Sequence, residues 1–103
     1  MATVTKRDLV MRISDKVGLS QREVLEAIEQ LMLEITESLS EGDEVVFRNF
    51  GTFQTAINKP KVGRNPKRPE IEIEIPARRV VRFRTGKNLK MRVEEKHELG
   101  KSR

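Results

Sequence analysis

A basic, proline-rich segment, KPKVGRNPKRPEIEIEIP at residues 59–76, sets the main limit on how this chain can fold. Its first half is too highly charged to be buried, and Pro60, Pro66 and Pro69 cannot donate the hydrogen bonds of a central strand. Outside it, fewer than 90 of the 103 residues remain to form a hydrophobic core, and so short a chain keeps much of its surface wet. We therefore expect a second chain, in the simplest case an identical one, to complete the core.

The same segment ends in a pattern that is typical of a strand. Glutamate and isoleucine alternate over residues 70–75, with the period of two that a strand produces. The simplest structure is a two-stranded ribbon that turns near residues 65–69, with legs of about 33 Å at the usual rise per residue. An isolated hairpin is barely stable in water, so we expect this arm, residues 59–76, to be mobile until a partner holds it. A solvated loop is the alternative that composition allows, but the regular alternation argues against it.

The charges of the chain are distributed unevenly. Residues 1–58 hold six basic and ten acidic side chains, whereas residues 59–92 hold 12 basic and three acidic ones. One part of the chain is therefore suited to a polyanionic partner. The sequence has no cysteine, so it can form no disulfide. No apolar run approaches the roughly 20 residues that cross a bilayer, and no signal-peptide pattern is present; we expect a cytoplasmic protein without a membrane partner.

Capping patterns predict two helices in the N-terminal part. Thr5 and Asp8 form a capping box in which Asp replaces the usual Glu or Gln, and Gly18 provides a left-handed end. Ser20 and Glu23 form a second capping box. The apolar positions of the second helix are Val24, Leu25, Ile28, Leu31, Met32, Ile35 and Leu39. This face is broader than one short helix needs, so it should contact more than one neighbour.

After the second helix the apolar period changes to two. The turn sequence NFGTF at residues 49–53 predicts two strands in succession, and a third strand should cover about residues 71–84. Residues 85–86, Thr-Gly, can begin a short last helix. The predicted fold is α+β, with two N-terminal helices, a three-stranded antiparallel sheet with a long protruding β-ribbon arm, and a short C-terminal helix. We expect one domain over residues 1–95 and a flexible polar tail over residues 96–103.

The basic side chains of the arm suggest its partner. They are Lys59, Lys61, Arg64, Lys67 and Arg68, and they can neutralise phosphate groups. On the third strand Arg78, Arg82 and Arg84 share one face, because alternate residues of a strand point the same way. A ribbon fits a nucleic-acid groove, arginine and asparagine can reach the acceptors of the minor groove, and a rigid proline can wedge between base pairs. Double-stranded DNA is therefore the expected partner.

Four motifs resemble one known family. They are KVGLSQRE at 16–23, FGTF at 50–53, GRNPK at 63–67 and IPARRVVRFRTGKNLK at 75–90. Together they resemble the HU/integration host factor family of bacterial DNA-bending proteins, over about residues 4–93. The resemblance implies an intertwined dimer, either a homodimer or a heterodimer with a paralogous subunit. It also implies an architectural role at the nucleoid of the bacterial cytoplasm, which compacts DNA and assists recombination, replication or transcription complexes.

The resemblance also assigns roles to individual residues. It implies that Pro66 inserts between base pairs, with Arg64 and Asn65 beside it in the minor groove; the family is a known example of such wedging. The residues implied to hold the DNA flanks are Arg78, Arg82, Arg84, Lys87 and Lys90, together with backbone amides at the start of the last helix. The residues implied to form the core at the subunit interface are Phe47, Phe50, Phe53 and Phe83. Arg48 has two interpretations, an arginine in the minor groove or a solvated charge at a strand end.

The sequence departs from the family pattern at four places. Pro76 lies ten positions after Pro66 where the pattern has nine, and KRPE replaces a Thr-Gly turn. Asn49 replaces a glycine, although asparagine tolerates the left-handed region. Glu74 occupies a position that is often lysine, and we expect it to pair across the ribbon with Lys59 or Lys61. The C-terminal tail exceeds the HU pattern, and the tail and ARRVV are closer to integration host factor subunits.

Other function classes have weaker support in the sequence. An RNA-binding or ribosome-associated basic module is the main alternative, but the chain has no Tyr or Trp on which bases could stack. A protein-binding or membrane-surface module would not need Asn-Pro at the tip. The glutamates of the second helix are typical of a solvated face, and the single histidine, His97, has no accompanying metal ligands. We therefore expect no enzyme activity, no cofactor, no metal and no small-molecule substrate.

Overall fold

The structure is a computed structural model that describes residues 2–101, with the backbone alone described for 96–101. The chain divides into two compact units, residues 1–37 and 38–103, and each is described by itself. The side chain of His97 lies outside the described residues. No helix in the described part of the chain is long and apolar enough to cross a membrane.

The first unit begins with the predicted helix α1 (Lys6–Val17). The Thr5 hydroxyl accepts a hydrogen bond from the Asp8 amide at 3.2 Å, and the Asp8 carboxylate accepts one from the Thr5 amide at 3.0 Å. The hydrogen bond from the Thr5 backbone lowers the pKa of Asp8, because it stabilises the charged carboxylate. Gly18 ends the helix at a φ of 75°. The predicted capping box and left-handed stop are both confirmed.

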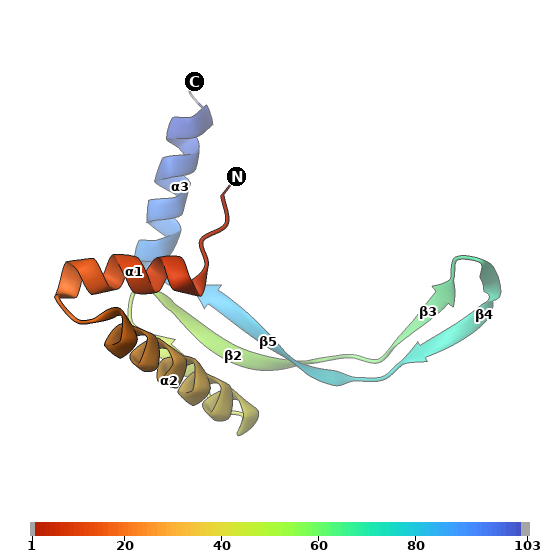
Figure 1. Cartoon of the computed structure of the whole chain (residues 1–103). Coiled ribbons are helices and arrows are strands. Elements are labelled where there is room, and N and C mark those ends of the chain that lie inside the picture. Colours follow the sequence, from red (N-terminus) through yellow and green to blue (C-terminus); the bar gives the residue numbers. More distant parts are fainter. Residues whose placement is uncertain (1, 102–103) are drawn as a thin grey trace. The chain divides into compact units, whose positions relative to one another are not determined.

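Helix α2 (Gln21–Ser40) starts at the second predicted capping box. Ser20 and Glu23 exchange hydrogen bonds of 3.1 and 3.2 Å between side chain and backbone. Figure 1 shows α1 and α2 joined by a short connection. An ion pair of 3.1 Å between Lys6 and Glu29 links the two helices on their exposed side.

The protomer buries too little apolar surface to form a normal core. The hydrophobic side chains that the structure buries within the described part are Val10, Val24 and Leu39. Exposed ones on the two helices include Leu9, Met11, Ile13, Val17, Leu31, Met32 and Leu33. Monomeric proteins rarely leave so many large apolar side chains exposed together. The shortage of core that the sequence predicted is therefore confirmed.

The second unit contains a three-stranded antiparallel sheet in the order β1-β2-β5. Its strands are β1 (Val45–Phe47), β2 (Gly51–Asn58) and β5 (Arg78–Thr85). Asn49 lies in the turn between β1 and β2 at a φ of 65°, and the Phe50 amide closes the turn by donating to the Phe47 carbonyl at 2.9 Å. Asparagine therefore replaces glycine in this left-handed position, as the sequence predicted.

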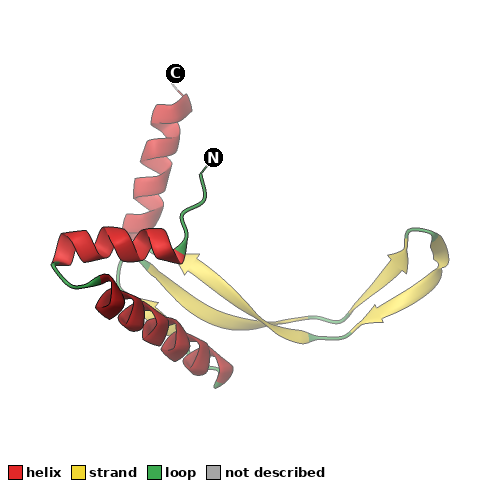
Figure 2. Ribbon diagram, in the orientation of Figure 1, coloured by secondary structure: helices red, strands yellow, loops and turns green. Residues whose placement is uncertain are grey.

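A second, two-stranded sheet forms the outer part of the arm. It consists of β3 (Lys61–Asn65) and β4 (Arg68–Ile75), which pair antiparallel. The prediction of one continuous strand over residues 71–84 is wrong, since β4 ends at Ile75 and β5 begins at Arg78 (Figure 2). Pro60 on one leg and Pro76 on the other cause the interruption, because neither has an amide hydrogen to donate to the ladder.

Helix α3 (Lys87–Lys101) is longer than the short helix that the sequence predicted. Residues 96–101, expected to form a flexible tail, continue the helix, and residues 102–103 lie outside the described part. Residues 94–99 consist mainly of Glu, Lys and Leu, whose intrinsic propensity favours a helix after the apolar spacing has ended.

The start of α3 is attached to the β1–β2 turn. The Gly86 amide donates to the Phe50 carbonyl at 2.8 Å, and the Asn88 amide donates to the Asn49 carbonyl at 3.2 Å. The expectation that the amides opening this helix bind phosphate is therefore wrong for Gly86 and Asn88. Their donors are used to fix the helix on the turn.

Gly86→Ala should destabilise the protein strongly at this attachment. A Cβ atom at Gly86 would lie 2.7 Å from the backbone carbon of Asn49 and 2.8 Å from that of Phe50. Because backbone atoms cannot rotate away, we expect a loss of roughly 1–3 kcal/mol, which lowers the melting temperature by roughly 4–8 °C per kcal/mol. Thermal unfolding followed by circular dichroism measures it.

Gly63→Ala is the matched control for this prediction. The same added methyl group would meet the end of the Ile75 side chain at 3.3 Å, and that side chain can move. We expect little change in the melting temperature of Gly63→Ala. Equal melting temperatures for both variants and the parent would show that the attachment of α3 is not tight.

Candidate nucleic-acid interface

One face of the sheet carries the predicted row of arginines. In the register of β2 and β5, Arg78, Arg82 and Arg84 lie opposite Asn58, Gln54 and Thr52. All three arginines are exposed. Arg82 donates a hydrogen bond of 3.2 Å to the Asn58 side chain, which orients its guanidinium group along the strand. The prediction that these arginines share one face is confirmed.

The opposite face of the sheet carries Phe47, Phe53 and Phe83, and Phe50 of the β1–β2 turn joins their ring cluster. The ring centroids of Phe53 and Phe83 are 4.8 Å apart, and those of Phe50 and Phe83 are 5.9 Å apart. Phe47 lies edge-on to both Phe50 and Phe53, at 6.3 and 6.4 Å. The cluster is only partly covered, since Phe50 is 51% exposed and Phe83 is 40% exposed. The sheet therefore has a basic face and an aromatic face that needs a partner surface.

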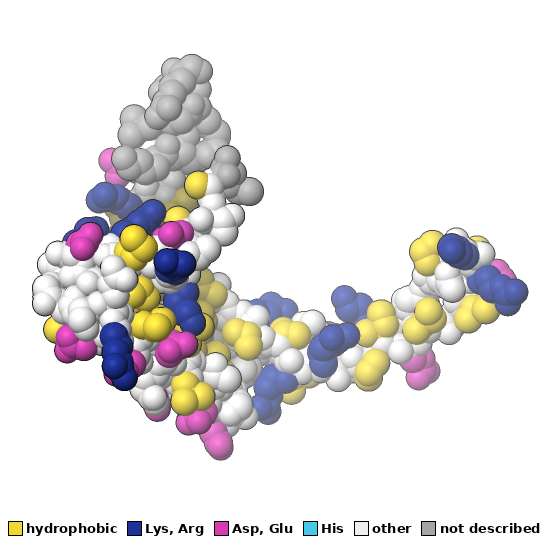
Figure 3. Space-filling model, in the orientation of Figure 1, with side chains coloured by type: hydrophobic (Ala, Val, Ile, Leu, Met, Phe, Trp, Pro, Cys, Tyr) yellow, Lys and Arg dark blue, Asp and Glu magenta, His cyan; other side chains and the backbone are white. Residues whose placement is uncertain are grey.

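The arm presents its basic side chains to solvent. Lys59, Lys61, Arg64, Lys67 and Arg68 are all exposed. Figure 3 shows Lys and Arg side chains spaced along the arm to its tip, with hydrophobic side chains between them. Among the described residues, Arg64 is the only one of these five with an ion-pair partner. The other four are therefore free to meet phosphate groups.

The tip of the arm is the turn at residues 66–67, within the range that the sequence predicted. The Asn65 side-chain oxygen accepts a hydrogen bond from the Lys67 amide at 2.9 Å, so it holds the chain on both sides of Pro66. Pro66 itself is exposed. The structure therefore presents the proline ring at the outer end of a hydrogen-bonded turn.

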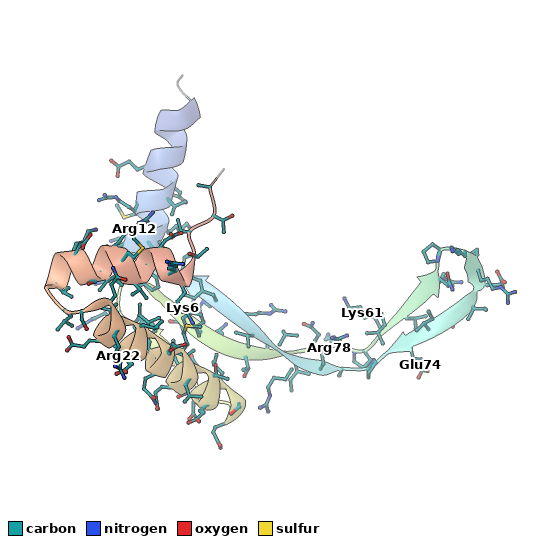
Figure 4. All side chains as sticks on the ribbon, viewed as in Figure 1. Lys6, Arg12, Arg22, Lys61, Glu74 and Arg78 are labelled. Carbon is teal, nitrogen blue, oxygen red and sulfur yellow. The ribbon has the colours of Figure 1, made fainter. Side chains whose placement is uncertain are left out.

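The predicted pairing of Glu74 with Lys59 or Lys61 is wrong. Glu74 lies opposite Val62 in the register, and Lys61 lies opposite Ile75. Neighbouring register positions point to opposite faces of a ribbon, and Figure 4 shows Lys61 and Glu74 projecting to opposite sides. The ion pair that does cross the ribbon joins Arg64 to Glu72 at 3.4 Å, a contact that sequence reasoning missed.

The remaining predicted DNA contacts lie near the start of α3. Lys87 and Lys90 are exposed and three residues apart on this helix, so they lie on the same side of it. Arg48 is exposed in the β1–β2 turn and lines a hollow with Phe50 and Leu89. Both interpretations of Arg48, a groove contact and a solvated charge, remain compatible with this position. In the described part of the chain no cluster of His, Cys, Asp or Glu could hold a metal ion.

Comparison with known proteins decides the family. The family model described as "Bacterial DNA-binding protein" matches residues 4–94. The chain belongs to this family of bacterial DNA-binding proteins. It is 43% identical over 94 residues to the probable DNA-binding protein HU of Chlamydia trachomatis, which covers 91% of this chain and 94% of that protein. It is 45% identical over 94 residues to the integration host factor subunit alpha of Marinobacter nauticus, and this match covers 91% of this chain and 93% of that protein.

A solved structure from the same family shares the fold. The Anabaena HU protein in a cocrystal with DNA superposes with a TM-score of 0.81 at 34% identity, covering 86% of this chain and 96% of that one. The predicted α+β fold with its projecting ribbon is confirmed by this match. The resemblance to the HU/integration host factor family is also confirmed, since relatives of both names match at similar identity.

Proposed function

We propose that two copies of this chain form an intertwined dimer whose two arms hold and bend double-stranded DNA. The chain is an architectural DNA-binding protein of its family and not an enzyme. The observation that carries the proposal is the arm, which places an exposed proline at the end of a ribbon with exposed basic side chains. We place this activity at the bacterial nucleoid, where it would compact DNA and assist recombination, replication or transcription complexes.

The uncovered apolar surface supports the dimer. Five large apolar side chains are each at least 40% exposed in the protomer: Phe50 of the β1–β2 turn, Phe83 of β5, and Leu31, Met32 and Leu33 of α2. Burial of apolar surface stabilises by about 25 cal/mol per Å², so a partner that covers these side chains gains substantial free energy. Either an identical chain or a paralogous subunit would serve, and the relative named a subunit of integration host factor illustrates the second arrangement.

The charges support binding through the phosphate backbone. Arg78, Arg82 and Arg84 on β5 and the lysines at the start of α3 would contact the DNA flanks, and the arms would follow the minor groove. Each phosphate contact that releases a counterion makes the fall of log K with log salt steeper by about 0.9. The affinity should therefore be high at low salt and should fall steeply as salt increases.

The proposal is tested by comparing ligands of equal length. We expect the protein to bind nicked or bent duplex DNA more tightly than straight duplex, because part of the deformation cost is already met. RNA should bind more weakly, because the arm carries no aromatic side chain on which unpaired bases could stack. Equal or tighter binding of RNA would contradict the proposal and favour the RNA-binding alternative.

Arg84→Ala tests the flank contact directly. We expect weaker binding to all duplex sequences alike and a salt slope that is shallower by about 0.9. Arg22→Ala is the matched control, since Arg22 is an exposed arginine of α2 that pairs with Glu26 at 3.4 Å. An unchanged salt slope for Arg84→Ala would remove this residue from the interface.

A further inference from the structure

The return leg of the arm contains a bulge. Arg64 pairs with Glu72 in the register, but the next residue, Asn65, pairs with Arg68. Residues 69–71 therefore have no partner residue on β3. This irregularity includes Pro69 and Glu70 of the KRPE departure and accommodates the longer spacing between Pro66 and Pro76.

The Arg64 side chain closes the bulge. Its Nη1 donates to the Pro69 carbonyl at 3.0 Å, and its Nη2 contacts the Glu72 carboxylate at 3.4 Å. The Pro69 carbonyl belongs to the unpaired segment, so the guanidinium supplies a hydrogen bond that the ladder does not. Both terminal nitrogens of Arg64 are thus directed at the arm itself.

These contacts conflict with the minor-groove role that we propose for Arg64. A guanidinium is a rigid planar fork, so the edge that faces Pro69 and Glu72 turns away from both when the side chain is redirected toward a DNA groove. If Arg64 enters the minor groove beside Pro66, it has to release the Glu72 carboxylate. We infer that Glu72 competes with DNA for Arg64 and so sets the affinity of the arm. This inference rests on the proposed DNA-binding function.

The exposure of the pair limits the size of the effect. The side chains of Arg64 and Glu72 are 60% and 61% exposed, so solvent screens their attraction. Exposed ion pairs contribute little, so removing the competitor should tighten DNA binding by about two- to fivefold. The pair is weak enough for DNA to displace it, yet its loss is measurable.

Glu72→Gln is the direct test, with Glu74→Gln as the matched control. Both variants remove one negative charge from the same face of β4, but Glu74 lies opposite Val62 and makes none of the contacts to Arg64. On a nicked duplex at low salt, we expect Glu72→Gln to bind more tightly than Glu74→Gln. Equal gains would mean that only the net charge matters, and weaker binding by Glu72→Gln would mean that Glu72 prepares Arg64 for DNA; either result overturns the inference.

A double-mutant cycle assigns the effect to Arg64. Glu72→Gln should no longer tighten DNA binding when this substitution is introduced into an Arg64→Gln protein, because Glu72 then has no guanidinium to hold away from DNA. A gain that persists in the Arg64→Gln background would overturn the inference, since Glu72 would then act on DNA without Arg64.

A measurement without DNA separates this inference from the proposed function. The nitrogen-15 NMR signal of the Arg64 Nε–H group in the free protein should shift in Glu72→Gln and stay unchanged in Glu74→Gln. If the parent protein fails to bind duplex DNA, the proposed function fails, whereas this signal still reports whether Glu72 contacts Arg64. If the Arg64 signal is the same in Glu72→Gln as in the parent, the inference is overturned, whatever the result with DNA.

Discussion

Pro66→Ala should reduce the bend that the protein imposes on duplex DNA far more than it reduces affinity. Insertion of an apolar wedge unstacks a base step and kinks the duplex by about 20–90°, and alanine is too short and too mobile to hold a step open. We expect the bend to fall by roughly half or more. The affinity should fall by less than about tenfold, because phosphate contacts dominate it and unbent DNA has no deformation cost.

Fluorescence energy transfer between the duplex ends, measured at saturation, gives the bend independently of the affinity. Pro69→Ala is the matched control, since Pro69 is an exposed proline of the same tip that lies in the bulge rather than the turn. We expect Pro69→Ala to bend DNA as the parent does. A Pro66→Ala protein that still produces the full bend would exclude the proline wedge.

Phe50→Asp should break the dimer. Phe50 is 51% exposed in the protomer and contacts both Phe47 and Phe83 at the edge of the ring cluster. A partner surface over this cluster would bury the new carboxylate without a counter-charge. Uncompensated buried charges cost about 3–5 kcal/mol, so we expect the dimer dissociation constant to rise at least about a hundredfold. Analytical ultracentrifugation across a concentration series measures it.

The control for this prediction is Val62→Asp, which places the same acid at an exposed apolar position of the arm. We expect the dimer dissociation constant of Val62→Asp to equal that of the parent, while its affinity for DNA falls. DNA binding by Phe50→Asp should be lost at concentrations where the chain is monomeric, since one arm then acts alone. A Phe50→Asp protein that stays dimeric would move the subunit interface away from the ring cluster.

Local patterns predicted the parts of the fold that depend on neighbouring residues. The capping boxes at Thr5 and Ser20 are satisfied within four residues, so the sequence locates both helix starts. Asn49 was predicted to adopt the left-handed turn because its own side chain tolerates that conformation. The arm was also predicted from a local pattern, the prolines and the alternation of isoleucine and glutamate.

Two of the features that the sequence did not predict depend on how two strands align. The interruption of the ribbon arises because Pro60 and Pro76 fall at the same level of opposite legs, which requires the register to be known. The ion pair across the ribbon joins Arg64 to Glu72, whereas the sequence predicted a pair between Glu74 and a lysine. The bulge beside the tip shifts the pairing of the two legs, and the sequence does not show this shift. Helix α3 continues past residue 95 on intrinsic propensity, where apolar spacing gives no further signal.

The central claim is that a dimer with two arms bends duplex DNA, and its most direct test is energy transfer between dyes on the two ends of a straight duplex. When the duplex is saturated with the unaltered protein, the account predicts a large rise in transfer at one dimer per duplex. Unchanged transfer at full occupancy, with the duplex still straight, would contradict it.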